Sequence, residues 1–391
     1  MLLLVVELVV TLLSYAALVE SECRIPTLWP YNGTSIWNTP LGSGAVWGYT
    51  SLFPQDDGPN LTPKCAPWAL GVDEMVFLLA SGSDPTVPWY SQGHWGPPKT
   101  PEAYCAITGA LVGQLHVPFN FTSPSGGASG NPGPSVAWGG NYAVSLLQPD
   151  QETVLTTQPV YRCAPGSPWL AELPRQPGGG YSNIVKDSGN LGGHGGSGLS
   201  GLGGAIRLGE MLPGAPPIRH ALQLEFYAHL FYYLPPDGSR AECFSWPATQ
   251  CDGYCFSPCD KNPGCYGGTN PLLRPGALLG VPREDVPAVN ASLATPPARR
   301  LLEALSTFGG YIVDDTFWNA TAVTAERGVR EEFKAAYGFD MNTTAAATGA
   351  AGLWYRDYLL LMRSLYVVVN NAPQTQGGGG EPLAPLPPPF C

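Results

Sequence analysis

The 391-residue sequence has few charged residues of either sign, and basic residues are especially scarce. Only 13% of its residues are charged, against about 25% in an average globular protein. The 19 lysines and arginines are outnumbered by 30 aspartates and glutamates, which gives a net charge of −11. Nucleic-acid binding requires clusters of basic side chains that neutralise phosphates. A nucleic acid is therefore not an expected partner, and the surface must be solvated largely through uncharged groups.

A membrane span needs about 20 consecutive apolar residues. Beyond the first 19 residues, the sequence has no apolar run that approaches this length. The first run is followed by polar residues 20–22 and by small residues that suit a cleavage site. It predicts a signal peptide over residues 1–21, although Glu7 interrupts the run and no basic residue precedes it. An uncleaved anchor is the alternative. After cleavage we expect no membrane contact.

Signatures of a nucleotide site or a serine hydrolase are missing as well. The densest glycine segment, residues 189–204, lacks the Gly-Lys-Ser/Thr ending of a phosphate-binding loop. Ser197 lies in this segment, but Leu199 stands where a Gly-x-Ser-x-Gly elbow requires glycine. Two interpretations stay open: a close-packed loop within a sandwich, or a ligand site, since functional groups often lie on loops.

The features that are present are typical of an exported protein. All ten cysteines follow the predicted cleavage point, and an even number in an exported chain predicts disulfides. Six sequons predict N-glycosylation, at Asn32, Asn60, Asn120, Asn290, Asn319 and Asn342. We therefore predict a disulfide-bonded glycoprotein secreted to the extracellular space or the cell wall.

Half of the cysteines lie close together in one short segment: Cys243, Cys251, Cys255, Cys259 and Cys265. Zinc sites need reduced thiols, commonly in closely spaced pairs, whereas disulfides are favoured outside the cell. We expect these five to be bonded largely among themselves. Because five is odd, at least one must be free or bonded elsewhere. No metal ion and no cofactor are expected.

Strand patterns separated by glycine, proline or asparagine dominate the chain. We predict strands over residues 74–80, 110–119, 135–147, 153–163, 218–234 and 311–316. Apolar stripes at helical spacing occur only later, around residues 301–308, 329–337 and 354–365. The pattern predicts a mainly β fold, a β-sandwich of which a jelly roll is one form, with a few C-terminal helices. We expect a single domain over residues 22–376.

Residues 377–391 are a Gly/Pro-rich tail that begins with four glycines. Glycines lose much conformational entropy on ordering, and prolines cannot join the interior of a sheet. We expect residues 377–380 to leave the folded body and the proline-rich segment to be extended. A disulfide from Cys391 to Cys23, for example, would instead hold the tail on the surface as a strap, since chain termini often lie close together.

The strand predicted over residues 218–234 separates two faces. His220 lies on its apolar face, where a buried histidine with satisfied hydrogen bonds is the ordinary case. The other face carries polar groups, which form either a solvated surface or a carbohydrate groove in which a proton can be moved. With the two residues that follow the glycine segment, they are the predicted substrate-binding residues: Arg207, Glu210, Gln223, Tyr227 and His229.

The predicted catalytic residues are His194 in the glycine segment, Glu225 on the polar face, and Asp314 near a strand end. Asp314 and Asp315 are adjacent, so in a strand they point to opposite faces and cannot flank one glycosidic bond together. Either could pair with Glu225 or Glu210 from another strand. Alternatively, these aspartates bind backbone amides at a turn.

Several tryptophans in Gly/Pro-rich surroundings could stack on sugar rings, although buried tryptophans are more common. They are Trp47, Trp68, Trp89, Trp95, Trp138 and Trp169.

Six segments taken together resemble an uncharacterised secreted family of bacterial and algal proteins. They read SIWNTPLGSGAVW, HGGSGLSGLGGAIRLGE, PIRHALQLEF, FSWPATQCDGY, GGYIVDDT and VVNNAPQTQGGGG. The resemblance covers nearly the whole chain after the signal peptide in a consistent order, which favours one continuous unit. It implies no particular reaction and no catalytic residues. Residues 255–265 depart from it and look like an added disulfide loop, which cannot carry a function common to the family.

Two functions fit these observations. The first is a carbohydrate-active hydrolase or lyase that binds or cleaves an extracellular polysaccharide. The second is a non-catalytic glycoprotein of the cell wall or matrix, or a lectin, whose partners are polysaccharides or matrix glycoproteins. Convergence of the predicted polar residues in one place, with a perturbed carboxylate among them, would favour the enzyme.

Overall fold

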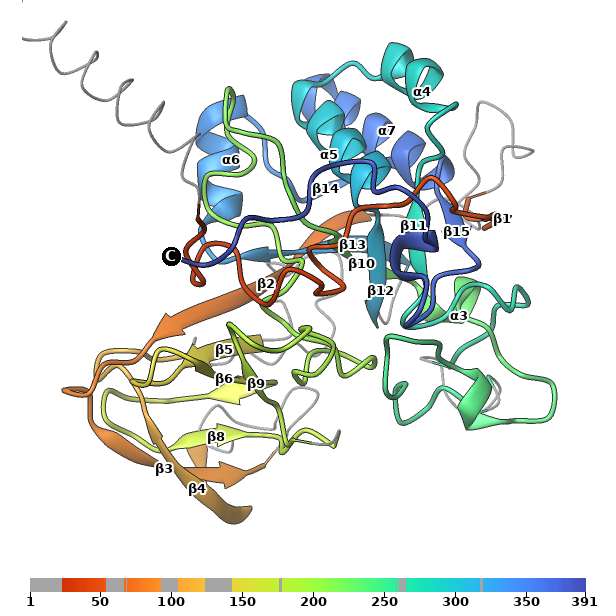
Figure 1. Cartoon of the computed structure of the whole chain (residues 1–391). Coiled ribbons are helices and arrows are strands. Elements are labelled where there is room, and N and C mark those ends of the chain that lie inside the picture. Colours follow the sequence, from red (N-terminus) through yellow and green to blue (C-terminus); the bar gives the residue numbers. More distant parts are fainter. Residues whose placement is uncertain are drawn as a thin grey trace, which may run out of the picture.

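The computed structural model describes residues 23–53, 67, 69–92, 105–123, 143–175, 178–257, 259, 265–316 and 319–391. The predicted signal peptide, the sequon at Asn60 and the residues 135–142 of one predicted strand lie outside this part. Within it the fold is mainly β with few helices, as predicted (Figure 1). None of the described helices is long and apolar enough to cross a membrane.

Most strands belong to one 11-stranded sheet. Its order is β1 (Trp47–Tyr49), β15 (Tyr366–Val368), β11 (Leu278–Gly280), β12 (Gly310–Asp315), β10 (Leu222–Phe226), β13 (Ala320–Glu326), β2 (Ala69–Leu79), β5 (Ala143–Leu147), β6 (Thr153–Thr157) and β9 (Tyr181–Asn183), with β14 (Thr343–Thr344) also paired to β2. A second sheet has the order β4 (Ala110–His116), β3 (Thr86–Ser91), β8 (Trp169–Ala171) and β7 (Val160–Tyr161).

The two sheets form a sandwich at one end of the molecule. Val76 of β2 and Val144 of β5 share a core with Trp89 of β3 and Trp169 of β8. The topology is not that of a jelly roll, which is built from antiparallel Greek keys. Here the pairs β10–β12, β13–β2 and β2–β5 are parallel, and long connections separate the paired strands.

Helices cover one face of the large sheet, as Figure 1 shows for the longer ones. The described helices are α3 (Ala228–Phe231), α4 (Val286–Ser292), α5 (Pro296–Thr307), α6 (Val329–Tyr337) and α7 (Gly349–Arg363), with short 3₁₀ turns η2 (Arg240–Glu242) and η3 (Gln376–Gly378). The three predicted apolar stripes coincide with α5, α6 and α7. Their buried side chains share the largest core with Leu222, Leu224 and Phe226 of β10, so the other face of β10 is left for polar groups.

The long strand predicted over residues 218–234 is wrong in extent. Strand β10 covers only Leu222–Phe226, and the chain then turns into α3. The turn is stabilised from within the core, because the Tyr232 hydroxyl accepts a hydrogen bond from the Phe226 N–H and donates one to the Asp314 carbonyl. Phe231 packs on Phe226 from the same turn. The alternation of the strand therefore stops at Phe226, and the residues beyond it are not part of its polar face.

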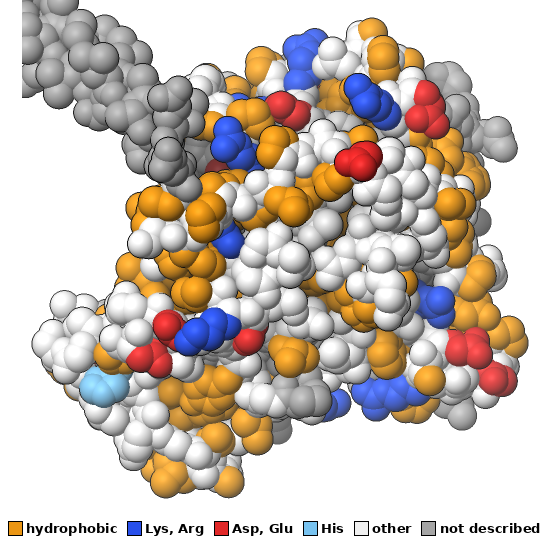
Figure 2. Space-filling model, in the orientation of Figure 1, with side chains coloured by type: hydrophobic (Ala, Val, Ile, Leu, Met, Phe, Trp, Pro, Cys, Tyr) orange, Lys and Arg blue, Asp and Glu red, His pale blue; other side chains and the backbone are white. Residues whose placement is uncertain are grey.

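Four disulfides join described cysteines: Cys23–Cys391, Cys105–Cys163, Cys251–Cys255 and Cys259–Cys265. The expected local pairing in the cysteine-rich segment is confirmed, and Cys243 is its free member. Charged side chains are sparse on the face drawn in Figure 2, where hydrophobic and uncharged groups dominate, in keeping with the low charge of the chain.

The prediction that residues 377–380 leave the folded body is wrong, and the strap is confirmed. Gly377 and Gly378 are buried, and the Gly42 N–H donates to the Gly377 carbonyl over 2.9 Å. The extended proline-rich segment leads to the Cys23–Cys391 disulfide, beside which the Arg24 guanidinium lies 3.7 Å from the centre of the Phe390 ring. The backbone hydrogen bonds and the Cys23–Cys391 disulfide offset the conformational entropy that the glycines lose when they become ordered.

We expect Gly378→Ala to destabilise the protein more than Gly214→Ala. Both glycines have positive φ, so both substitutions incur the left-handed strain of about 1–2 kcal/mol. A Cβ at Gly378 would also lie 2.5 Å from the Ala45 Cα, whereas nothing lies within 4 Å of one at Gly214. Overpacking adds about 1–3 kcal/mol. Urea unfolding measures both variants, and equal losses would contradict the packed strap.

Candidate functional site

A buried polar cluster lies on the face of β10, β12, β13 and β2 opposite the main helical core. The glycine-rich segment, residues 189–204, covers it. Gln223 of β10 holds this segment in place, because its Nε2 donates to the carbonyls of Ser200, over 2.7 Å, and Gly203. The Ser197 N–H donates to the Val313 carbonyl of β12 over 3.1 Å. The close-packed loop and the candidate site are thus the same segment.

His194 points from this segment to a carboxylate that the sequence did not single out. Its Nε2 lies 3.2 Å from Oδ2 of Asp73 on β2, and the imidazole is fully buried. Burial alone would lower the pKa of His194, but the hydrogen bond and charge of Asp73, with the charge of Asp314, raise it. The pair therefore favours an imidazole that holds its proton.

Glu225 is the second acid of the cluster and is 3% exposed. One of its oxygens, Oε1, accepts a hydrogen bond of 3.2 Å from Oγ1 of Thr324 on β13. The register aligns Thr324 with Asp73, which brings Asp73 to the same face as Glu225. Burial first, and then the charges of Asp73 and Asp314, raise the pKa of Glu225 well above its usual value.

Asp314 joins Glu225 because of an irregularity in β12. The register of the parallel pair shifts between Leu224 and Glu225, so Asp314, not Val313, becomes the partner of Glu225. Such bulges re-aim side chains. Asp314 Oδ1 accepts a hydrogen bond of 3.1 Å from the Gly196 N–H.

The expected separation of Asp314 and Asp315 on opposite faces is not found. Carboxylate oxygens of Asp252, Asp314 and Asp315 lie within 4.8 Å of one another. Alternation fails at the shifted register, where β12 ends. Tyr254 and Tyr266 complete this group, since their hydroxyls donate to Asp315 over 2.9 Å and to Asp252 over 2.7 Å.

Asp314 has the most informative electrostatics of the cluster. Burial, followed by the charges of Asp252 and Asp73, raises its pKa to about 7, against the opposing effects of His194 and the Gly196 amide. The Asp314 carboxyl therefore keeps its proton to a higher pH than an ordinary aspartate does. A carboxyl poised in this way is suited to general acid–base catalysis.

Only glycine fits where the loop meets the carboxylates. A Cβ on Gly195 would lie 2.4 Å from Asp314 Cγ, and one on Gly196 would lie 2.3 Å from Asp252 Oδ2. Gly195 also has a φ of +53°. The glycine content of this segment thus follows from the close approach of its backbone to the acids.

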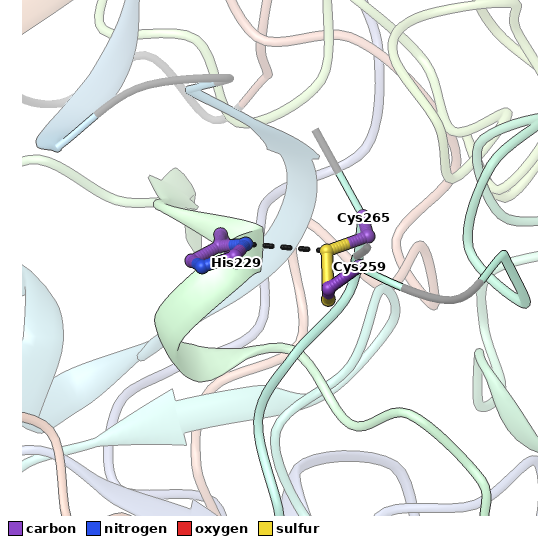
Figure 3. A group of neighbouring side chains, drawn as sticks. All are labelled: His229, Cys259 and Cys265. Atoms are coloured by element: carbon purple, nitrogen blue, oxygen red, sulfur yellow. Dashed lines mark hydrogen bonds between the residues drawn. A yellow bond between two sulfur atoms is a disulfide. The ribbon is translucent and has the colours of Figure 1, made fainter. Parts of the chain in front are cut away.

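Two groups have the donor atoms of a cation site: Asp73 with His194 and Glu225, and Asp252 with Asp314 and Asp315. We assign no ion to either, because protons on Glu225 and Asp314 also relieve the repulsion. His229 and the Cys259–Cys265 disulfide are a third close group (Figure 3). Sulfurs joined in a disulfide are not thiolate ligands, so this group is structural.

The predicted site residues divide into two sets. His194, Glu225 and Asp314 lie close together, and Gln223 lies beside them. Tyr227 is close enough to Asp315 for its charge to add to the effect of burial in raising the tyrosine pKa. His229 lies outside the cluster, with Nδ1 3.2 Å from the Cys265 sulfur (Figure 3).

Arg207 and Glu210 belong to a separate buried network. Arg207 Nε lies 2.8 Å from Glu326 Oε2, and Glu210 Oε2 lies 3.1 Å from His220 Nε2. His220 is buried, and its ring nitrogens contact Glu210 and the Ala221 carbonyl, as in the ordinary interpretation of its position. Arg300 binds the carbonyls of the same loop. This network fixes the chain between residues 205 and 220.

Sequence reasoning missed Asp73 and Asp252. Asp73 lies just before the predicted start of its strand at residue 74, although β2 begins at Ala69. Asp252 lies between two cysteines, whose pattern explained that segment without it. Alternation from Gly71 in an earlier-starting strand is the signal that could have found Asp73.

The burial of the described tryptophans does not favour the stacking of their rings on sugars. Trp89 and Trp169 are buried, and Trp47 is half-buried; Trp68, Trp95 and Trp138 lie outside the described residues. No described tryptophan is among the exposed large side chains. Among the described sequons, Asn120 and Asn290 are exposed and Asn32 and Asn319 are half-buried, whereas Nδ2 of Asn342 is buried.

Comparison with known proteins identified no matching family model, no similar curated protein and no similar solved structure.

We expect His220→Gln to lower stability most between about pH 4.5 and 6.5. Burial alone would lower the pKa of His220, but the charge and hydrogen bond of Glu210 raise it above 6.5. The contribution of His220 to stability is therefore complete below pH 6.5 and is lost as the pH rises through the pKa of the folded state. His220 in turn lowers the pKa of Glu210 below 4.5, so that contribution is lost as pH falls.

Urea unfolding of both proteins at acid, intermediate and alkaline pH measures the difference between them. A difference that stays constant with pH would contradict the ion pair.

Proposed function

We propose that this protein is an exported enzyme that cleaves an extracellular polysaccharide by acid–base chemistry, as a hydrolase or a lyase. The observation that carries the proposal is the buried pair formed by Glu225 and Asp314, whose pKa values are both raised, beside the His194–Asp73 pair. Active sites are where several titratable groups with perturbed pKa values are brought together.

Export is supported by the disulfides. Disulfides persist in oxidising compartments and are rare in the cytosol. Four are present among the described cysteines. One of them includes Cys23, which lies just after the predicted signal peptide. Glycosylation at the exposed Asn120 and Asn290 fits the same environment, whereas the buried Nδ2 of Asn342 is poorly placed for a glycan.

The roles follow from the protonation of each group. Asp314, with a pKa of about 7, is the group that donates a proton to the leaving oxygen. Glu225 lies beside it, and because the two carboxyls repel each other when both are ionised, the proton on Asp314 leaves Glu225 as the ionised base or nucleophile. Asp73 keeps His194 protonated and oriented, so the imidazole stabilises negative charge in the cluster. The Tyr254 and Tyr266 hydroxyls hold the carboxylates of Asp315 and Asp252 in place.

Substrate entry requires the glycine-rich segment to move. Glu225 and Asp314 are at most 5% exposed beneath it. The segment is held by backbone hydrogen bonds and by Gln223, and it has no large side chain at its contact with Asp314. Loops that open and close over catalytic groups are common in enzymes and exclude water from the reaction.

The second candidate is a non-catalytic wall or matrix glycoprotein, or a lectin. The strap and its terminal disulfide favour it, because they suit long residence outside the cell. The convergence of His194, Glu225 and Asp314 favours the enzyme, as does the lack of an exposed tryptophan platform among the described residues.

Asp314→Asn and Glu225→Gln should each lower the release of reducing ends from the cleaved polysaccharide by at least about 10²-fold. The control is Asp340→Asn, which alters a carboxylate paired with Arg330 outside the cluster and should keep full activity. The assay uses a panel of neutral and acidic polysaccharides, and ultraviolet absorbance of an unsaturated sugar end distinguishes a lyase from a hydrolase.

Full activity in both variants would contradict the assigned site. Glycan-array binding by the wild type without cleavage of any polymer in the panel would favour the lectin.

A further inference from the structure

A free thiol lies against a disulfide in the cysteine-rich segment. The sulfur atoms of Cys243, Cys251 and Cys255 lie within 4.8 Å of one another, and all three residues are buried. Cys251 and Cys255 are bonded, while Cys243 is free. The single S–H of Cys243 has two carbonyl acceptors within reach, that of Ser239 at 3.5 Å and that of Cys255 at 3.3 Å. Either hydrogen bond holds the thiol beside the bond it could attack.

We propose that Cys243 exchanges with the Cys251–Cys255 disulfide, so that the protein exists as more than one disulfide isomer. The Cys243 thiolate attacks one of the two bonded sulfurs, and a new S–S bond forms as the old one breaks. The displaced cysteine leaves as a thiolate and takes up the proton that Cys243 lost. The number of disulfides is unchanged, so the exchange needs no oxidant or reductant.

The exchange would change the surroundings of the carboxylate cluster. Asp252 and Tyr254 lie between Cys251 and Cys255, and the present bond closes a short ring around them. Through Tyr254 and the Asp252 carboxylate this ring contacts Asp315 and Asp314. Moving the bond to Cys243 opens the ring, so the isomer that forms decides whether Asp252 is fixed beside Asp314. This consequence depends on the observed contacts and not on the proposed activity.

The exchange should be slow near neutral pH. Burial raises the pKa of Cys243 to about 11. The nearby charges of Arg240 and Arg274 oppose this effect, and Glu242 and Asp237 add to it. Because the thiolate is the attacking species, the rate should rise about tenfold for each pH unit below the pKa of the thiol.

The experiment follows the position of the free thiol in the purified protein. Samples are kept without oxygen at pH 7, 8, 9 and 10, quenched in acid, unfolded and labelled with a maleimide before non-reducing peptide mapping. We expect the label to move from Cys243 to Cys251 or Cys255, at a rate that rises about tenfold per pH unit. A label that stays on Cys243 at every pH would overturn the proposal, as would a disulfide between Cys243 and Cys65.

Two variants identify the attacking thiol. Cys243→Ser should leave Cys251 and Cys255 unlabelled at every pH, because it removes the attacking sulfur. Cys65→Ser should leave the exchange unchanged, since Cys65 is the other cysteine outside the four disulfides. Equal labelling of Cys251 or Cys255 in wild type and Cys243→Ser would overturn the proposal, and the wild-type map alone decides it if either variant fails to fold.

Discussion

The close approach of the glycine backbone at residues 195–196 to the carboxylates of Asp314 and Asp252 is the constraint on which the site depends. A single added Cβ at either glycine would overlap these acids. The contact removes water from the acids and supplies one amide N–H, from Gly196, to Asp314. Burial without a matching number of positive charges keeps the protons on the acids, which explains why the pKa values of Asp314 and Glu225 are raised.

The fold makes this contact possible by placing the core and the site on opposite faces of the same strands. The even-numbered residues of β10 pack under the helices, so Gln223 and Glu225 are free to bind the loop and join the acids. A shift of register in β12 then turns Asp314 to the same side. Covalent closure through Cys23–Cys391 and the two short disulfides of the cysteine-rich segment fixes segments that lack a large core of their own.

Periodicity in the sequence was enough to predict the three longer helices, the buried strand before Asp315 and the polar parity of Gln223 and Glu225. The glycine-rich segment, the polar parity and a strand end also singled out His194, Glu225 and Asp314 as candidates. Periodicity failed where tertiary contacts override local pattern: Tyr232 turns the chain after Phe226, and the bulge cancels alternation at Asp314. Residues 377–380 were misjudged for the same reason, since their partners at residues 42–44 lie more than 300 positions away. Local composition contains no information about such pairing.

The proposed chemistry depends on a buried carboxyl at Asp314 that exchanges its proton near neutral pH. Isotope-edited infrared spectroscopy of the carboxyl bands, recorded against pH for the wild type and for Asp314→Asn, measures this directly. The difference between the two titrations should show one carboxyl with a pKa of about 7, and Asp252→Asn should lower it, because the charge of Asp252 is a main cause of the shift after burial. A carboxyl at Asp314 that titrates near its ordinary value of 3.8 would contradict its role as the proton donor.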